Sequence, residues 1–171
     1  MSNKYNYKLK NKPDFDVLSE NPKEVADKIK ETFLENNIEQ CSIIRHNKIG
    51  EIIPEHYEIK VGDNTVAFIY KQISCHSYNT ISNGKTKIKI ATIDTMLSFY
   101  LAFIYINSEY YDRNRILCMS KYLFEVQAKN RLAQKGVLKR FSTNCYGHQK
   151  TLKEIFSEKN YKFKKIKKNS T

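Results

Sequence analysis

Two aspartates, Asp14 and Asp16, stand two positions apart near the start of the chain, where Val17 and Leu18 predict the end of a β-strand. Residues two apart on a strand point to the same face, about 6.6 Å apart along it. We therefore expect both carboxylates to aim at one point, with Phe15 anchored beneath them. Such a pair suits Mg²⁺, which takes oxygen ligands, and two ions roughly 3.5–4 Å apart promote in-line displacement at phosphorus. The alternative is two solvated acids beside a turn.

A second set of residues with possible chemistry is the cysteines, which are widely spaced and form no C-x-x-C pair: Cys41, Cys75, Cys118 and Cys145. This spacing predicts reduced thiols in an intracellular protein. Cys75 with His76, and Cys145 with His148, are two half-motifs that could together form a zinc site. Buried thiols and ordinary histidines are the simpler interpretation.

The first half of the chain predicts a helix and a set of strands that would position the aspartates. Asn21, Pro22 and Glu24 have the pattern of an N-cap, a first helical residue and a capping-box partner, and the apolar stripe that follows ends at 36–37. A strand is predicted at 41–45. The β-rich segments 56–61 and 65–73 flank a tight turn and predict a hairpin.

Further along, Asn83-Gly84 marks another turn, with a short strand at 87–90. Thr92 is expected to cap a helix that runs to Ile106 and is apolar on every side, which predicts a buried core helix, not a base-stacking platform. Asp94 in its first turn favours a helix-dipole partner over a catalytic acid.

The remaining residues predict a second helix at 112–129, a loop, a short helix at 151–157 and a disordered basic tail at 162–168. In the second helix we expect an apolar face turned inward, formed by these residues: Ile116, Leu117, Met119, Leu123, Phe124 and Val126. The chain of 171 residues is long enough for one domain, or for two small ones that share a core.

The net charge of +12 is unevenly distributed along the chain. Residues 13–58 carry 5 basic and 11 acidic side chains, whereas residues 85–140 carry 11 basic and 4 acidic ones. Basic residues interleaved with aromatic ones over 130–147 suit a single-stranded RNA, because phosphates need cations and unstacked bases need flat partners. A basic surface kept for solubility is the alternative. The candidates for RNA contact are Arg113, Arg115, Arg131, Lys139 and Arg140.

The order of these parts resembles the palm of the DNA polymerase β-like nucleotidyltransferases, and more closely the poly(A) polymerase catalytic subunits of large cytoplasmic DNA viruses such as mimivirus and poxvirus relatives. Four segments over roughly residues 12–150 carry the resemblance: Lys12-Pro-Asp-Phe-Asp-Val-Leu-Ser19, 67–79, 93–103 and 114–147. The implied fold is α+β: a truncated, mostly antiparallel palm with a helix at 1–90, a helical domain at 91–160 and a disordered basic tail at 161–171.

The resemblance implies transfer of AMP from ATP to an RNA 3′ end with two Mg²⁺ or Mn²⁺ ions, and assigns the first two metal ligands to Asp14 and Asp16. A third carboxylate is expected on the outgoing strand of the hairpin, where Phe68 stands instead. Glu58 and Asp63 are the nearest acids. Tyr78 and Asn79 lie in a segment specific to the viral group, where a structural turn and a nucleotide contact are both open.

Enzymes of this group also carry a Gly-Gly/Ser turn upstream of the aspartates, and no glycine precedes Asp14 here. We therefore expect the C-terminal portion of a longer or split enzyme, with a non-catalytic RNA-binding or dimerisation module as the alternative. Expected partners are an RNA 3′ end, ATP, and a second copy or a processivity subunit. No apolar run reaches about 18 residues, so we expect no membrane partner. The N-terminus has no apolar signal core, so we expect no secretion. The resemblance implies a location in the host cytoplasm or the virion.

Overall fold

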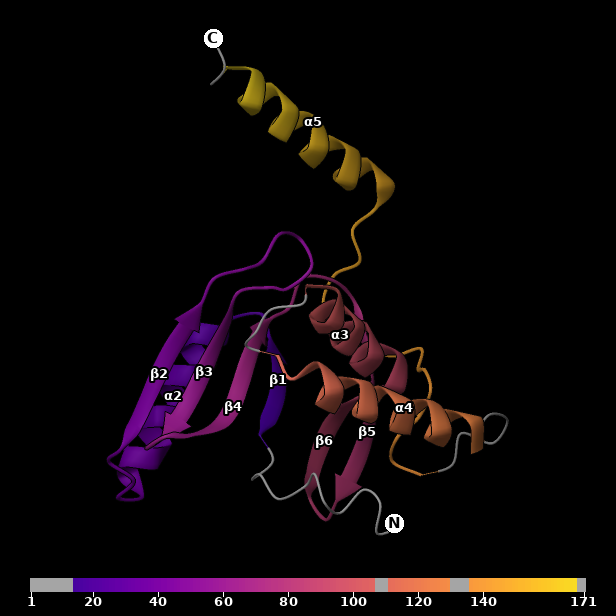
Figure 1. The fold of residues 1–171 in the computed structure, drawn as a ribbon. Helices are drawn as coiled ribbons and strands as arrows, with labels where there is room; N and C mark the ends of the chain where they lie inside the picture. Colours follow the sequence, from indigo (N-terminus) through magenta and orange to yellow (C-terminus); the bar gives the residue numbers. More distant parts are fainter. Residues whose placement is uncertain (1–13, 107–110, 130–135, 169–171) are drawn as a thin grey trace.

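The computed structural model describes residues 14–106, 111–129 and 136–168 (Figure 1). The elements in chain order are β1 (Phe15–Ser19), α2 (Pro22–Glu35), β2 (Cys41–His46), β3 (His56–Val61), β4 (Asn64–Lys71), β5 (His76–Asn83), β6 (Thr86–Ala91), α3 (Ile93–Ile106), α4 (Arg113–Lys129), β7 (Cys145–Tyr146) and α5 (Leu152–Lys168). The α+β fold class expected from the sequence is confirmed.

Within the described residues, four strands form one sheet in the order β1-β4-β3-β2 (Figure 1). Strands β2, β3 and β4 are antiparallel neighbours, and β1 is added to the edge parallel to β4. The β3–β4 hairpin turns through Gly62, whose φ of +57° lies in the left-handed region that favours glycine. The register places Asp16 beside Phe68, and Phe68 beside Glu58.

Helix α2 covers one face of this sheet. Its buried contact with the sheet is formed by these residues: Ala26, Cys41, Tyr57, Ile59, Ala67 and Ile69. Pro22 occupies the first helical turn as expected, but the predicted capping box is wrong. The Asn21 side chain makes no capping hydrogen bond. The Asn21 backbone N–H, which Glu24 would have bonded, donates instead to Ser19 Oγ at 3.1 Å.

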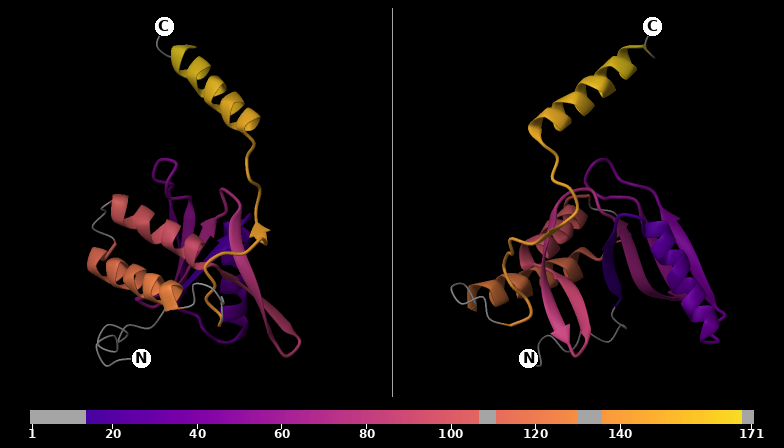
Figure 2. Two further views of the ribbon diagram at one scale, coloured as in Figure 1. Left: turned by 90° about the vertical axis from the view of Figure 1, so that its right-hand side faces the viewer. Right: turned by 180° about the vertical axis from the view of Figure 1, so that it is seen from behind.

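Helices α3 and α4 lie side by side against the opposite face (Figures 1 and 2). They bury Phe68 and Tyr70 of β4 beneath Phe103 and Ile116. The expectation that the helix at 92–106 is buried all round is wrong, because one side of α3 faces solvent: Leu101 is 52% exposed and Tyr105 78%. On α4, Leu117 and Phe124 are likewise exposed and do not point inward as expected.

A second sheet follows, in the order β6-β5-β7 within the described residues. The turn at Asn83-Gly84 and the strand after it are confirmed, whereas β5 was not expected. Thr92 caps α3 through its hydroxyl, to which the Thr95 N–H lies at 3.4 Å. The backbone carbonyls of Lys139 and Arg140 accept hydrogen bonds from the N–H groups of Ile93 and Asp94, at 2.8 and 3.1 Å. The segment after α4 thus closes the start of α3.

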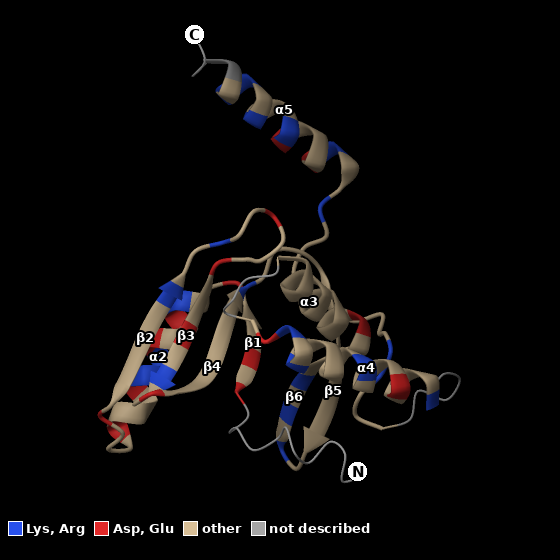
Figure 3. Ribbon diagram, viewed as in Figure 1, with Lys and Arg blue, Asp and Glu red and all other residues tan. Residues whose placement is uncertain are grey.

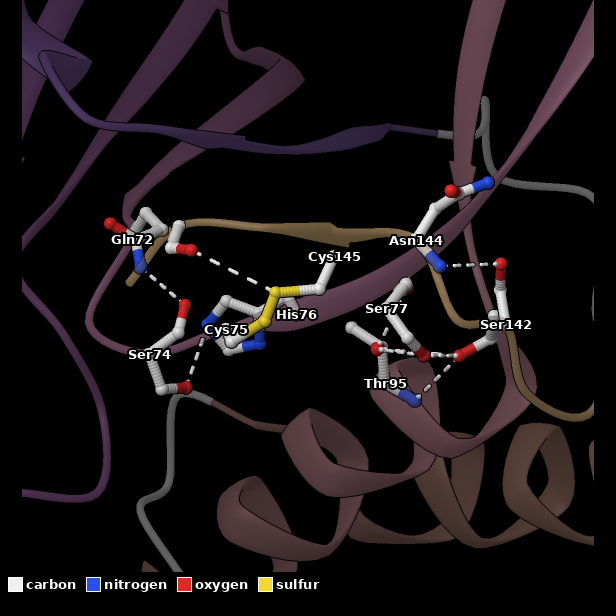
Figure 4. The surroundings of a disulfide bond; sticks show 11 residues. Gln72, Ser74, Cys75, His76, Ser77, Thr95, Ser142, Asn144 and Cys145 are labelled. Carbon is white, nitrogen blue, oxygen red and sulfur yellow. Dashed lines mark hydrogen bonds between the residues drawn. A yellow bond between two sulfur atoms is a disulfide. The ribbon is translucent and has the colours of Figure 1, made fainter. Parts of the chain in front are cut away.

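Cys75 and Cys145 form a disulfide bond with their Cα atoms 5.4 Å apart, which joins the segment before β5 to β7 (Figure 4). The expectation of four reduced thiols is therefore wrong for this pair, while Cys41 and Cys118 are free. Sequence spacing could not reveal the pairing, because the antiparallel contact between β5 and β7 brings together residues 70 positions apart.

Gly147 lies directly after β7 with φ of +102°. A Cβ at this position would meet the Gln72 side chain and would lie 2.5 Å from the Ser74 backbone oxygen. We expect Gly147→Ala to lower the free energy of unfolding by about 1–3 kcal/mol, because the φ is unfavourable and the Ser74 backbone has to move. Urea denaturation measures this change.

Gly84→Ala is the matched control for Gly147→Ala. Gly84 also has a positive φ, +59°, but a Cβ there would meet no atom within 4 Å. This variant keeps the conformational cost of a side chain at positive φ but avoids the collision. Its free energy of unfolding should therefore fall by about 1 kcal/mol or less. Equal losses in the two variants would contradict a close approach between Gly147 and the backbone before β5.

Helix α5 runs from Leu152 to Lys168, so it is far longer than the expected helix at 151–157 and includes the segment 162–168 that was expected to be disordered. A capping box starts it: the Thr151 N–H donates to Glu154 Oε2 at 2.7 Å, and the Glu154 N–H donates to Thr151 Oγ1 at 3.3 Å. In the described part of the chain, no helix is long and apolar enough to cross a membrane.

Candidate metal and nucleotide site

Strand β1 presents both aspartates toward α3 and α4. Asp14 directly precedes β1 and Asp16 is its second residue, so strand alternation turns the two side chains to the same face. Leu18, on the same face, packs against the cluster around Phe68 and Tyr70. The expectation that Phe15 anchors the pair is wrong, because its side chain is 71% exposed. β1 is one of the two edge strands of this sheet, and α2 packs mainly over the other strands.

The Asp16 carboxyl has an unusual proton affinity. Asp16 as a residue is exposed to solvent, yet the protein around its carboxyl desolvates the charge, and together with the Asp14 carboxylate this raises the pKa of Asp16 from 3.8 to about 6. The Arg115 guanidinium and a hydrogen bond from Tyr70 oppose the shift. Two carboxylates that resist being charged together are typical of a site for a cation.

Arg115 of α4 closes the other side of the site. Its Nη2 lies 3.4 Å from Asp14 Oδ1, in a half-exposed ion pair that joins the start of α4 to the start of β1 (Figure 3). Tyr100 of α3 and Tyr111, just before α4, lie close by. Burial raises the pKa of both phenols, and the charge of Asp16 raises it further. The two aspartates are thus framed by one guanidinium and by two phenols that stay neutral.

The position of the expected third carboxylate is occupied by Phe68, as the sequence analysis placed it. Phe68 is the direct neighbour of Asp16 across the β1–β4 pair and is buried. Glu58 is one strand further, about 10 Å from Asp16 at the usual strand spacing. Its carboxylate accepts hydrogen bonds from Thr65 and from His46 Nε2, the latter at 2.9 Å.

These contacts decide the charge state of Glu58. Burial alone would raise the pKa of its carboxyl, but the hydrogen bonds from Thr65 and His46 and the charges of His46 and Lys60 hold it below the usual value. The Glu58 carboxylate is therefore held in its charged form by partners on β2 and β4. Asp63 lies in the exposed β3–β4 turn. Neither acid joins the aspartate pair.

The donors at this site fit one divalent ion. Mg²⁺ is commonly held by one or two carboxylates with water and substrate phosphate oxygens as further ligands, and Asp14 and Asp16 supply that number. In the residues that the structure describes, no group of three His, Cys, Asp or Glu side chains is placed to hold a metal. The same finding applies to the zinc site considered for the cysteines and histidines, whose two cysteines are bonded to each other.

The five candidates for RNA contact do not form one patch. Arg113 and Arg115 lie at the start of α4, whereas Lys139 and Arg140 lie at the start of α3. Because α3 and α4 run antiparallel, these two groups are separated by the length of α3, roughly 20 Å for its 14 residues. Arg131 lies outside the described residues.

A cluster that the sequence analysis did not identify surrounds Lys89 of β6. Its Nζ lies 4.9 Å from the ring centre of Tyr78 and 5.5 Å from that of Tyr146. The Tyr146 hydroxyl also accepts a hydrogen bond from the Glu20 N–H at 3.2 Å. Tyr78 is thus part of β5 and of this cluster within the second sheet, and Asn79 beside it is buried. Neither residue forms the turn considered from the sequence.

The Arg115–Asp14 pair leads to a testable prediction. A guanidinium beside the aspartates repels a divalent ion, so Arg115→Ala should tighten Mn²⁺ binding at about pH 8 by roughly threefold, the scale of a half-exposed ion pair. Electron paramagnetic resonance of free Mn²⁺ measures the affinity. Arg113→Ala is the control, because Arg113 is two residues away and points to another side of α4. Equal affinities in both variants and the unmodified chain would contradict competition by Arg115.

Comparison with known proteins finds a similar fold among solved structures. No protein-family model matches the chain, and no curated protein matches it significantly. Among solved structures, the crystal structure of the Megavirus polyadenylate synthase matches with a TM-score of 0.63 over 90% of this chain, at 13% sequence identity. The chain spans about a third of the length of that protein, 33%. The likeness is therefore one of fold, and the chain has a polyadenylate synthase-like α+β fold.

Proposed function

We propose that this chain acts in the transfer of AMP from ATP to the 3′ end of RNA, as the part of a nucleotidyltransferase that carries the metal-binding aspartates. The observation that carries the proposal is the position of Asp14 and Asp16. They stand at the start of edge strand β1, facing Arg115 and two neutral phenols, in a fold similar to that of a polyadenylate synthase.

In this proposal, Asp14 and Asp16 hold a Mg²⁺ or Mn²⁺ ion. When bound, the ion lowers the pKa of the RNA 3′ hydroxyl and offsets the charge of the triphosphate. A bond forms between the 3′ oxygen and the α-phosphorus, the bond from that phosphorus to the β-phosphate oxygen breaks, and pyrophosphate leaves with the hydroxyl proton released to solvent. There is no covalent enzyme intermediate.

The residues of the chain contribute position and charge. Arg115 can exchange Asp14 for a phosphate oxygen when ATP arrives, because a guanidinium binds either anion in the same fork-like geometry. Tyr100 and Tyr111 would exclude water from the reacting phosphate. The second ion expected from the resemblance needs a further ligand, because Phe68 stands in the sheet position next to Asp16.

The proposed RNA contacts are the basic side chains at the two ends of α3. A single strand that touches Arg113 at one end and Lys139 and Arg140 at the other has to span roughly 20 Å, or about three to four extended nucleotides. Arg131 belongs to the same proposal. Contacts between these basic side chains and the RNA phosphates should make RNA binding weaken as the salt concentration rises.

The test is incorporation of labelled ATP onto a short single-stranded RNA with Mn²⁺ or Mg²⁺, with and without a chelator. Metal-dependent extension supports adenylyl transfer by the chain. RNA binding without extension, unchanged in Asp14→Ala and Asp16→Ala chains, would replace the proposal by the alternative of a non-catalytic RNA-binding module. A chain that neither extends nor binds RNA would overturn both.

A further inference from the structure

Helix α5 stands apart from the rest of the molecule. Figures 1 and 2 show it projecting beyond both sheets and beyond α3 and α4 on an extended connection. An ion pair between Lys162 and Glu51 joins it to the loop between β2 and β3. Leu152, Phe156 and Phe163 are 73%, 62% and 65% exposed. Large apolar side chains gathered on one helix and left exposed mark a surface that something else covers.

The spacing along α5 places these side chains on one side. At 100° per residue, one arc about 100° wide holds five apolar residues: Leu152, Ile155, Phe156, Phe163 and Ile166. Lys159 falls inside the same arc. Tyr161, which is 69% exposed, falls on the opposite side. The helix is thus amphipathic, with one long, flexible cation set within its apolar stripe.

The charge of α5 is strongly basic. Its sequence contains seven lysines and two glutamates (Figure 3). Both glutamates have local partners: Glu154 is bonded to Thr151 in the capping box, and Glu158 forms an ion pair with Lys150 at 2.7 Å. The capping box starts the helix without help from the body of the protein, and the lysines beyond Glu158 give its C-terminal half an excess of positive charge.

The positive charge of α5 argues against another basic protein surface as the partner that covers its apolar stripe. The exposed apolar side of α3 and α4, at Leu101 and Phe124, belongs to the helix pair that also carries Arg113, Lys121 and Lys129, so docking α5 there would bring like charges together. Pairing of α5 with a second α5 would place Lys159 in the seam between them. RNA would satisfy the lysines but would leave the apolar stripe uncovered.

An anionic bilayer surface can contact both the apolar stripe and the lysines of α5. Acyl chains cover apolar side chains, acidic headgroups attract lysines, and a lysine inside the stripe can extend its stem to the headgroups. We propose that α5 is an interfacial helix that lies on an anionic phospholipid surface, with Phe156 and Phe163 inserted. This proposal goes beyond the proposed catalytic role and revises the expectation of no membrane partner, which was based on membrane-spanning segments alone.

The test is sedimentation of the full chain with vesicles of phosphatidylcholine alone, and with vesicles in which roughly a third of it is replaced by phosphatidylserine. The chain should bind the anionic vesicles and hardly the neutral ones, and high salt should weaken the binding. Phe156→Ser with Phe163→Ser should lower the partition coefficient by about tenfold or more, since the two largest apolar groups of the stripe are lost.

Tyr161→Ser is the matched control, because it removes an equally exposed aromatic ring from the opposite side of the same helix. It should bind as the unmodified chain does, and thermal unfolding should show the same body fold in all variants. Equal loss in Tyr161→Ser, or no preference for anionic vesicles, overturns the proposal. Light scattering without vesicles tests the alternative partner, a second copy of the chain. Self-association that requires Phe156 and Phe163 would assign the stripe to that second copy instead.

Discussion

An Asp16→Asn chain should lose adenylyl transfer and at the same time become more stable. The loss follows from the proposed role, because an amide is a poor metal ligand, and we expect a decrease of roughly two to three orders of magnitude. The gain follows from the site itself, since desolvation and the nearby Asp14 make the charged Asp16 carboxylate unfavourable in the folded protein. If Asp16 had only a structural role, the Asp16→Asn chain would lose activity and stability together.

The raised pKa of Asp16 determines whether the free energy of unfolding rises or falls with pH. The folded-state pKa of Asp16 is raised from 3.8 to about 6, so between these values the folded protein keeps a proton that the unfolded chain has lost. The free energy of unfolding therefore falls as pH rises from about 4 to about 6, and it stays lower above that range. Solvent at this half-open site reduces the size of the effect but not its direction.

Urea denaturation from about pH 4 to about pH 8, with a chelator present, measures the slope in the unmodified and Asp16→Asn chains. The variant should lack the Asp16 part of the decline and be more stable at neutral pH. Asp63→Asn, in the exposed β3–β4 turn, is the control and should follow the unmodified chain in both stability and activity. A less stable Asp16→Asn chain with normal activity would contradict the proposed site.

Loss of the Cys75–Cys145 disulfide should cost about 4 kcal/mol of unfolding free energy. The bond closes a loop of 70 residues that holds β5, β6, α3 and α4, and the chain-entropy model gives this value for such a loop. Cys75→Ser and Cys145→Ser should each show the full loss, and a reductant should produce the same loss in the unmodified chain. The unfolded, oxidised protein should contain two free thiols.

Cys118→Ser is the matched control, because Cys118 is a free cysteine of α4. This variant should keep both its stability under oxidising conditions and its sensitivity to reductant. If the unmodified chain unfolds at the same urea concentration with and without reductant, the bond does not form in solution. The original expectation of reduced thiols would then stand.

The elements around the aspartates could be predicted because their signals are local. Pro22 fixes the start of α2, Asn36-Asn37 ends it, and the β3–β4 hairpin follows from a turn sequence between β-rich segments. These parts depend on neighbours within a few residues.

The features that could not be predicted depend on residues far apart in the sequence. Arg115 was expected on an RNA-binding rim, but the antiparallel packing of α3 and α4 returns it to Asp14, 101 positions away. The pairing of β5 with β7, and with it the disulfide, depends on the path of the chain after α4. The full length of α5 was missed for a different reason: its lysines suggested disorder, although its apolar spacing is helical.

The closure of α3 by Lys139 and Arg140 has a consequence for the order in which the protein is made. The first two amide groups of α3 meet their acceptors only after 46 more residues have been added, from Ile93 to Lys139. At ordinary rates of translation this takes roughly 2 to 9 seconds. During that time all four strands of the first sheet have been synthesised, whereas β7 of the second sheet has not. The first sheet can therefore form while the start of α3 still lacks these two acceptors, and such incompletely packed chains are what chaperones bind during synthesis.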